Sequence, residues 1–178
     1  KISELEKSGI LIRLKKGLYV VSPKKSGKLL SMELIANHLY GPSYVSMESA
    51  LRYYGLIPES VYITQSMTTK HSREFKNSLG KFEYTQCTKE YFAIGIRHEI
   101  KDNAAFLIAQ PEKALCDLIV NTPNLNMRFQ KEILTYLEDN LRFDMDAFFK
   151  MDANIFQQCA LVGKKKSTIT NIIKIIKK

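Results

Sequence analysis

The first 21 residues alternate between apolar and polar positions in a way that predicts a helix followed by a β-hairpin. Ile2 and Leu5 lie on one face of a helix, and Gly9 suits the left-handed conformation that ends it. Over residues 10–15 every second side chain is Ile or Leu, which is typical of a strand. Arg13 and Lys15 lie between them and give the strand one basic edge. Gly17 can take positive φ in a tight turn, and 18–21 returns as the partner strand. Helix, strand, basic turn and strand form the second half of a winged-helix unit.

A basic linker and two short helices are expected next. Residues 24–30 contain lysine, serine and glycine without an apolar period, so they are predicted to join the segment 1–23 to a larger domain, 31–178. Helical periodicity recurs over 31–41 and 46–55, and each of these segments begins with a serine N-cap and stops at a glycine.

The middle of the chain is rich in strand-forming residues, and the part that follows is helical. Four runs predict strands, separated in part by turn residues: 61–66, 81–86, 91–97 and 104–109. Amphipathic periodicity predicts helices over four later segments: 111–120, 127–141, 145–162 and 164–178. Strands followed by segregated helices indicate an α+β fold, here a partial winged helix followed by a mixed α+β domain with a helical C-terminal part.

The last segment carries an isoleucine face opposite its lysines, formed by Ile169, Ile172, Ile173 and Ile176. Packing of this face on the body of the protein is the favoured interpretation, because that is the commonest role of such a stripe. A membrane-surface helix fits less well, since the aromatic anchors expected there are missing. Docking on an acidic partner or on DNA through 164–166 stays open.

Charge is concentrated at the two ends of the chain. Residues 1–28 carry eight Lys or Arg and two Glu, a net +6, and 163–178 carry six Lys and no acid, another +6. The centre is left at −3, because the total is +9. Such a distribution indicates nucleic acid or an acidic partner. The first residue is Lys and not Met, so the chain is expected to begin inside a longer gene product or to have been trimmed.

Cysteine usage and hydropathy give a cytoplasmic interpretation. The chain has three cysteines, Cys87, Cys116 and Cys159. They are far apart and odd in number, which argues against a disulfide framework. No spacing of cysteines or histidines signals a metal site, and no cofactor motif is present. No apolar run approaches the roughly 20 residues that a membrane span needs, so no membrane association is expected.

Catalytic motifs are missing as well, and no catalytic residue is assigned. Glu112 and Asp117 are five residues apart and would not share a helix face, so Glu112 is interpreted as a helix-dipole residue. Lys113 and Asp117 are then expected to form an i,i+4 pair on the surface.

The hairpin turn is the strongest candidate for a binding surface. Arg13, Lys15 and Lys16 cluster where a wing would meet a phosphate backbone, and Lys7 and Ser8 lie at the end of the preceding helix. The plainer alternative is a solvated strand pair kept soluble by its lysines. The +6 charge on so small a segment favours DNA.

Three segments in this order resemble the AbiEi-type antitoxins of type IV toxin–antitoxin systems, which act in abortive-infection phage defence. The segments are GILIRLKKGLYVV, YVSMESALRYYGLIPES and FLIAQPEKALCDLI, and the resemblance spans about residues 9–120. It implies an N-terminal winged helix-turn-helix that binds inverted repeats near its own promoter and represses its own transcription. It further implies a C-terminal domain that neutralises a nucleotidyltransferase toxin, with no stable antitoxin–toxin complex required.

Carried over by position, the resemblance and the basic segments give two sets of residues. The DNA-contact set is Lys7, Ser8, Arg13, Lys15, Lys16, Tyr19, Lys24 and Lys25. The motif set is expected to be structural, with caps, small residues and a buried stripe: Ser46, Ser49, Ala50, Leu51, Gly55, Pro58, Pro111, Glu112, Lys113, Leu115 and Asp117.

One departure and two alternatives accompany this interpretation. Only the last helix of a winged helix is present, so DNA binding by this chain is expected to be weakened, because the recognition helix lacks its scaffold. A nucleic-acid-processing enzyme or its accessory subunit would use the basic ends to grip substrate, and would need clustered carboxylates and a divalent metal. A basic module that recruits an acidic protein is the third interpretation.

Overall fold

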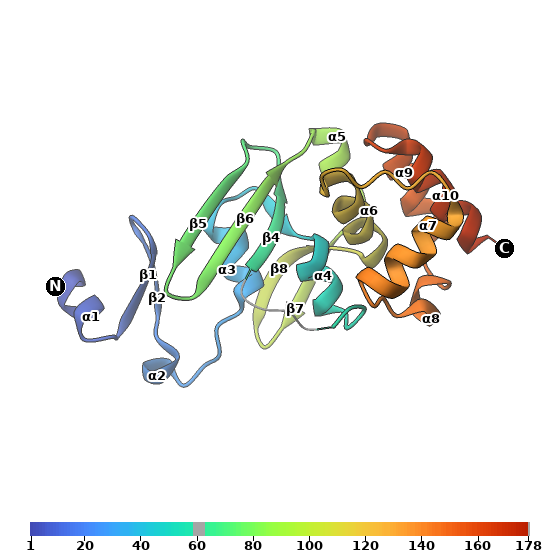
Figure 1. Ribbon diagram of the computed structural model, residues 1–178. Coiled ribbons are helices and arrows are strands. Elements are labelled where there is room, and N and C mark those ends of the chain that lie inside the picture. The colour runs from blue at the N-terminus through green and yellow to red at the C-terminus, as the bar shows by residue number, and fades with distance from the viewer. Residues whose placement is uncertain (59–62, 178) are drawn as a thin grey trace.

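The computed structural model describes residues 1–58 and 63–177 as a mixed α+β fold (Figure 1). The strands are β1 (Leu11–Lys15), β2 (Leu18–Val21), β3 (Ser43–Val45), β4 (Ile63–Thr68), β5 (Arg73–Asn77), β6 (Gly80–Gln86), β7 (Ile96–Lys101) and β8 (Ala104–Ala109). The helices are α1 (Ile2–Lys7), α2 (Pro23–Ser26), α3 (Met32–Leu39), α4 (Met47–Tyr53), α5 (Lys89–Phe92), α6 (Pro111–Asn121), α7 (Gln130–Thr135), the π-helical turn η1 (Tyr136–Asn140), α8 (Met145–Phe148), α9 (Ala153–Val162) and α10 (Lys166–Ile176).

A six-stranded mixed sheet in the order β5-β6-β4-β3-β8-β7 is the centre of the molecule. β4 runs parallel to β6 and β3 runs parallel to β8, while the remaining neighbours are antiparallel. Helices α3 and α4 pack on this sheet, and α4 also packs on α6, which joins the sheet to the C-terminal helices (Figure 1). Helices α6, α9, α10 and α7 then follow one another in contact. A single hydrophobic core runs through both parts.

The N-terminal helix and hairpin are confirmed. Gly17 has φ +81° in the turn, and β1 pairs antiparallel with β2 across it. The hairpin is fastened to the main sheet because Leu14 is only 5% exposed and belongs to the common core. The Asn77 amide, on the edge strand β5, also donates a hydrogen bond to the Leu14 carbonyl at 3.3 Å.

Several predicted elements change in the structure. The strand expected over 91–97 is wrong, because Tyr91 lies in the short helix α5 and β7 starts only at Ile96. Thr88 explains the change, since its side chain accepts a hydrogen bond from the Tyr91 amide and so caps a helix. The single helix expected over 145–162 is two helices, with Asp152 as the N-cap of the second.

Other elements were not anticipated. The short strand β3 and the edge strand β5 were missed, and the linker contains the one-turn helix α2. The run expected over 127–141 begins as an α-helix only at Gln130 and ends in a π-helical turn. Two residues of the predicted strand 61–66 lie outside the described residues.

The isoleucine face of α10 packs on the body of the protein, as favoured from sequence. Ile169 and Ile172 are fully buried, and Ile175 is almost so. Ile173 and Ile176 are only partly buried against the core. The buried face therefore runs along Ile169, Ile172 and Ile175, and the prediction had omitted Ile175. Within the described residues, no helix is long and apolar enough to cross a membrane.

Truncating this face should destabilise the fold. Ile172→Ala removes a side chain with 0% exposure and should cost about 2–5 kcal/mol in the free energy of unfolding, measured by urea denaturation. Leu161→Ala, at a side chain that is 75% exposed, is the matched control and should change the value by less than about 0.5 kcal/mol. Equal small effects would mean that α10 does not pack as described.

Candidate functional sites: a basic hairpin and a buried polar centre

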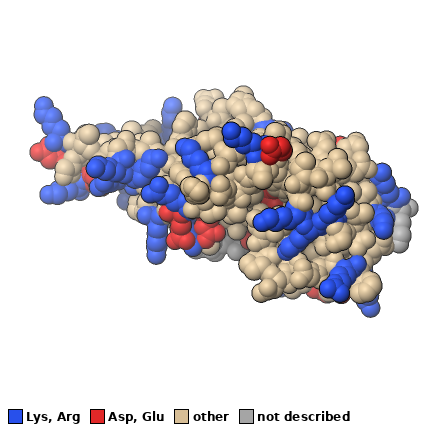
Figure 2. Space-filling model, turned by 90° about the horizontal axis from the view of Figure 1, so that it is seen from above, with Lys and Arg blue, Asp and Glu red and all other residues tan. Residues whose placement is uncertain are grey.

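The cations of the N-terminal segment are mostly exposed. Arg13 and Lys16 are exposed at the hairpin, and so are Lys7 and Ser8 at the end of α1. Lys24 and Lys25 are exposed on α2, and Tyr19 is half-buried on β2, directly opposite Arg13 in the hairpin register. Figure 2 shows lysine and arginine side chains over this end of the molecule and again over its helical end. The hairpin therefore presents cations to solvent.

Lys15 is the exception, because it turns back onto the body of the protein. Its ammonium donates a hydrogen bond to the Leu39 carbonyl at the end of α3 and lies 5.9 Å from the centre of the Phe75 ring. The hairpin register shifts between Arg13 and Lys15, and such an irregularity re-aims a side chain. Lys15 thus helps to hold the hairpin on the sheet. Arg13 and Lys16 are the cations of the turn that form no ion pair with any described residue.

The interpretation of Lys113 and Asp117 as a surface pair is wrong. Both side chains are 0% exposed, and the Lys113 ammonium lies 3.0 Å from Asp117 Oδ1. The pair is buried because α6 is enclosed from Glu112 to Ile119 and contacts α4, α9 and β8. Removing one partner of such a pair leaves an uncompensated buried charge, which typically costs about 3–5 kcal/mol.

Two residues of the strand–helix segment 44–46 complete the surroundings of Asp117. The Ser46 hydroxyl donates to Asp117 Oδ2 at 2.6 Å, and the Tyr44 hydroxyl donates to the same oxygen at 3.0 Å. Burial raises the pKa of Tyr44 strongly, and the Asp117 carboxylate adds to this, so Tyr44 remains a neutral donor. Ser46 does precede α4, but its side chain makes no capping hydrogen bond, because the hydroxyl is used by Asp117.

The Lys113 ammonium is held from the opposite side by Tyr91. It donates to the Tyr91 carbonyl at 3.0 Å and lies 3.1 Å from the centre of the Tyr91 ring. The Tyr44 ring lies 5.8 Å away. A carboxylate, a carbonyl and two ring faces thus surround one buried cation, and together they offset the cost of removing it from water. We refer to Tyr44, Ser46, Tyr91, Lys113 and Asp117 as the buried polar centre.

The remaining residues of the motif set have structural contacts. The Ser49 hydroxyl accepts a hydrogen bond from the backbone N–H of Gln65 at 2.9 Å and donates one to the backbone carbonyl of Ile63 at 3.1 Å. Ser49 therefore links α4 to β4. Glu112 is buried in the first turn of α6, and its carboxylate accepts from the Asp152 amide at 2.9 Å, just before α9. Most of the others cap or pack: Ala50, Leu51 and Leu115 are buried, Gly55 has φ +69° after α4, and Pro111 starts α6. Pro58 is exposed.

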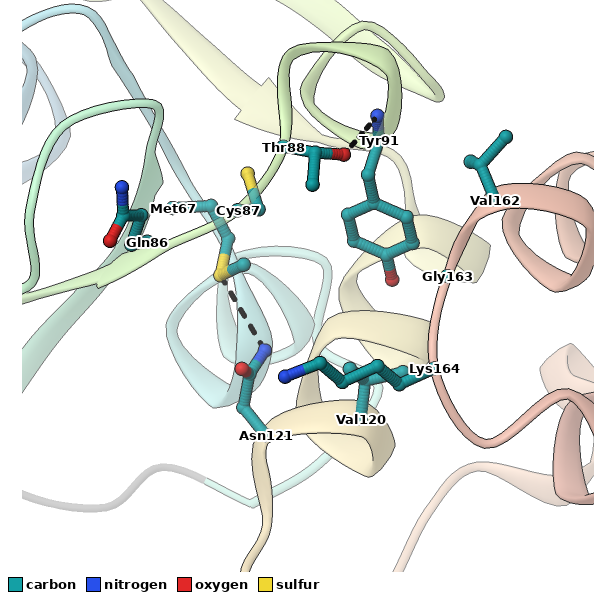
Figure 3. Close-up of a pocket in the computed structure, with 10 residues that line it drawn as sticks. All are labelled: Met67, Gln86, Cys87, Thr88, Tyr91, Val120, Asn121, Val162, Gly163 and Lys164. Atoms are coloured by element: carbon teal, nitrogen blue, oxygen red, sulfur yellow. Dashed lines mark hydrogen bonds between the residues drawn. The ribbon is translucent and has the colours of Figure 1, made fainter.

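A pocket of about 370 Å³ lies beside the buried polar centre (Figure 3). It is lined by Met67, Gln86, Cys87, Thr88, Tyr91, Val120, Asn121, Val162, Gly163 and Lys164. Lys164 reaches toward Asn121 from the α9–α10 connection, while the next residue, Lys165, donates to the carbonyls of Ile119 and Thr122 and closes the end of α6. Of the three lysines left open for docking, Lys165 therefore has an internal role.

In the described part of the chain, no group of three or more His, Cys, Asp or Glu side chains could hold a metal ion. Burial, with a smaller effect of the Asp117 charge, raises the pKa of the Cys87 thiol to about 11, which makes it a poor nucleophile. No protein-family model matches the chain, and no curated protein matches it either.

Two substitutions at one serine separate support of Asp117 from capping of α4. Ser46→Ala should lower the free energy of unfolding by about 1–3 kcal/mol, because a buried carboxylate loses a donor. Ser46→Asp should cost more than Ser46→Ala, because it places a second carboxylate beside Asp117. If Ser46 acted as a cap instead, Ser46→Asp would be tolerated, because aspartate is a good N-cap. Ser78→Ala, in the exposed β5–β6 turn, is the control for urea denaturation. A Ser46→Asp variant as stable as wild type would return Ser46 to a capping role.

The raised pKa of Cys87 predicts a pH profile for alkylation. Its rate with iodoacetamide should rise about tenfold per pH unit to near pH 11, and at pH 8 should be about 100-fold below that of an unperturbed thiol, because the thiolate fraction is smaller. Site-resolved mass spectrometry of the native protein measures it, and the same peptide labelled in urea is the control. A plateau near pH 9 would contradict the burial of this thiol.

Proposed function

We propose that this protein is a DNA-binding autorepressor and antitoxin of a type IV toxin–antitoxin system, acting by binding and not by catalysis. The observation that carries the proposal is the pair of exposed cations at the hairpin turn, Arg13 and Lys16, which form no ion pair within the described residues. Cations in such a turn can contact phosphates on a duplex and give affinity that depends on salt.

The resemblance to AbiEi-type antitoxins supplies the rest of the proposal. Helix α1 and the β1–β2 hairpin would be the recognition helix and wing of a winged helix-turn-helix, with inverted repeats in the operator as its target. Residues from 31 onward would form the effector domain that neutralises a nucleotidyltransferase toxin in the cytoplasm, without a stable complex.

The buried polar centre supports a non-enzymatic effector domain. Ser46 comes from the second resembling segment and Lys113 and Asp117 from the third, and these residues meet inside the protein where substrate has no access. Their contacts join the two segments inside one fold. The surface of that fold, and not these residues, would then act on the toxin.

Removing the turn cations should weaken DNA binding in a salt-dependent way. Arg13→Ala/Lys16→Ala should reduce affinity for operator and random duplex alike and lower the slope of log K against log salt by about 1.8, at about 0.9 per phosphate contact. Fluorescence anisotropy at several salt concentrations measures both. Arg97→Ala/Lys101→Ala, which removes the same charge from β7, is the control. Unchanged affinity and slope in the hairpin variant would remove the hairpin from DNA recognition.

The antitoxin role is tested in cells. The proposal requires a nucleotidyltransferase-like gene next to the gene of this protein. Expression of that gene alone should arrest growth, and co-expression of this protein should restore it. The hairpin variant should still restore growth when both genes have inducible promoters, because neutralisation is assigned to the other domain. Continued arrest with the wild-type protein present would contradict the antitoxin role while leaving DNA binding untouched.

A further inference from the structure

Three cations converge over two aromatic rings at the β5 edge of the six-stranded sheet. The Lys70 ammonium lies 5.3 Å from the centre of the Tyr40 ring. The Arg73 guanidinium lies 5.8 Å from the centre of the Tyr40 ring and 4.9 Å from that of the Phe75 ring, and the Lys15 ammonium lies 5.9 Å from the centre of the Phe75 ring. We call these five residues the basic–aromatic cluster.

The rings of the cluster have fixed positions. Tyr40 and Phe75 lie 5.7 Å apart, and both pack edge-on or tilted against Tyr84, at 5.3 and 5.8 Å. Tyr84 is 2% exposed, and its hydroxyl donates to the Ala36 carbonyl at 2.6 Å. The Tyr40 hydroxyl donates to the His71 carbonyl at 3.3 Å. The cations therefore rest on an aromatic platform anchored in the core.

In the described residues, no carboxylate forms an ion pair with Lys15, Lys70 or Arg73. The acidic residue next to Arg73 on the strand is Glu74, which alternation directs to the opposite face of the sheet, where it pairs with Lys81 at 2.8 Å. The mutual repulsion of the three cations is relieved only in part by the ring faces, so an anion bound among them would be stabilised.

The cluster is also continuous with the hairpin. Lys15 belongs to β1, and its ammonium bridges the hairpin to the Leu39 carbonyl and the Phe75 ring. Lys70 and Arg73 are exposed beside it. Lys15 thus links the hairpin that carries Arg13 and Lys16 to the sheet edge that carries Lys70 and Arg73.

We infer that the basic–aromatic cluster is a second phosphate-contact site, which holds the backbone of the same nucleic-acid duplex that the hairpin contacts. The inference rests on the DNA binding proposed above. A guanidinium stacked on a ring keeps its N–H edge free, and that edge matches the geometry of phosphate oxygens. Exposed cations in series, continuous with a hairpin of the same charge, fit a polyanion better than a single small anion.

A paired substitution tests the cluster. Lys70→Gln/Arg73→Gln should lower affinity for a fluorescein-labelled duplex of about 30 base pairs by about tenfold or more at low salt, and lower the salt slope by about 1.8. Lys15 is left in place because it fastens the hairpin. Arg97→Gln/Lys101→Gln is the matched control, since it removes one Arg and one Lys from the opposite edge, where Lys101 also lies on a tyrosine ring. Its affinity should stay within about twofold of wild type.

The outcomes separate this inference from the proposed function. Loss of binding in the hairpin variant together with wild-type binding in Lys70→Gln/Arg73→Gln would overturn the cluster and leave the hairpin in place. The reverse result would support the cluster and overturn the hairpin. Titration with inorganic tripolyphosphate, followed by thermal shift, covers the other source of phosphate. If tripolyphosphate stabilises the wild type and no duplex binds, the nucleic-acid assignment is overturned.

Discussion

The buried ion pair between Lys113 and Asp117 is the constraint on which the rest of the fold depends. Neither charge has access to water, so each must be met by protein groups. Those groups come from three places: Ser46 and Tyr44 from the β3–α4 segment, Tyr91 from α5, and the pair itself from α6. The arrangement thereby fixes the sheet against the C-terminal helices at one point.

This constraint separates a supporting interior from the exterior that is proposed to bind DNA. The residues that link the second and third resembling segments are enclosed. Arg13 and Lys16, which form no ion pair within the described residues, are exposed at the N-terminal end of the molecule. Lys15 connects the hairpin to the body of the protein, because its ammonium donates a hydrogen bond to the Leu39 carbonyl and keeps the hairpin against the sheet. A duplex contacting the hairpin would therefore also meet the edge of the main sheet.

Local signals in the sequence predicted much of the fold. Ser31 caps α3, with its hydroxyl accepting from the Leu34 amide, and Pro111 starts α6, both as expected. Two wrong predictions trace to local signals that were missed. Tyr91 lies among strand-forming residues, yet Thr88 caps a helix there. Lys113 and Asp117 have the spacing of a surface pair, and the available signal was that Ala, Leu, Cys and Ile surround them on every side of the helix.

A double-mutant cycle on the ion pair tests the account most directly, with unfolding free energy as the measurement. Lys113→Met and Asp117→Leu should each cost about 3–5 kcal/mol, because each leaves one charge buried alone. The double variant should be more stable than either single variant, since no buried charge is then left unpaired. Costs that simply add, or single variants near wild-type stability, would contradict a buried pair as the constraint that holds the sheet to the helices.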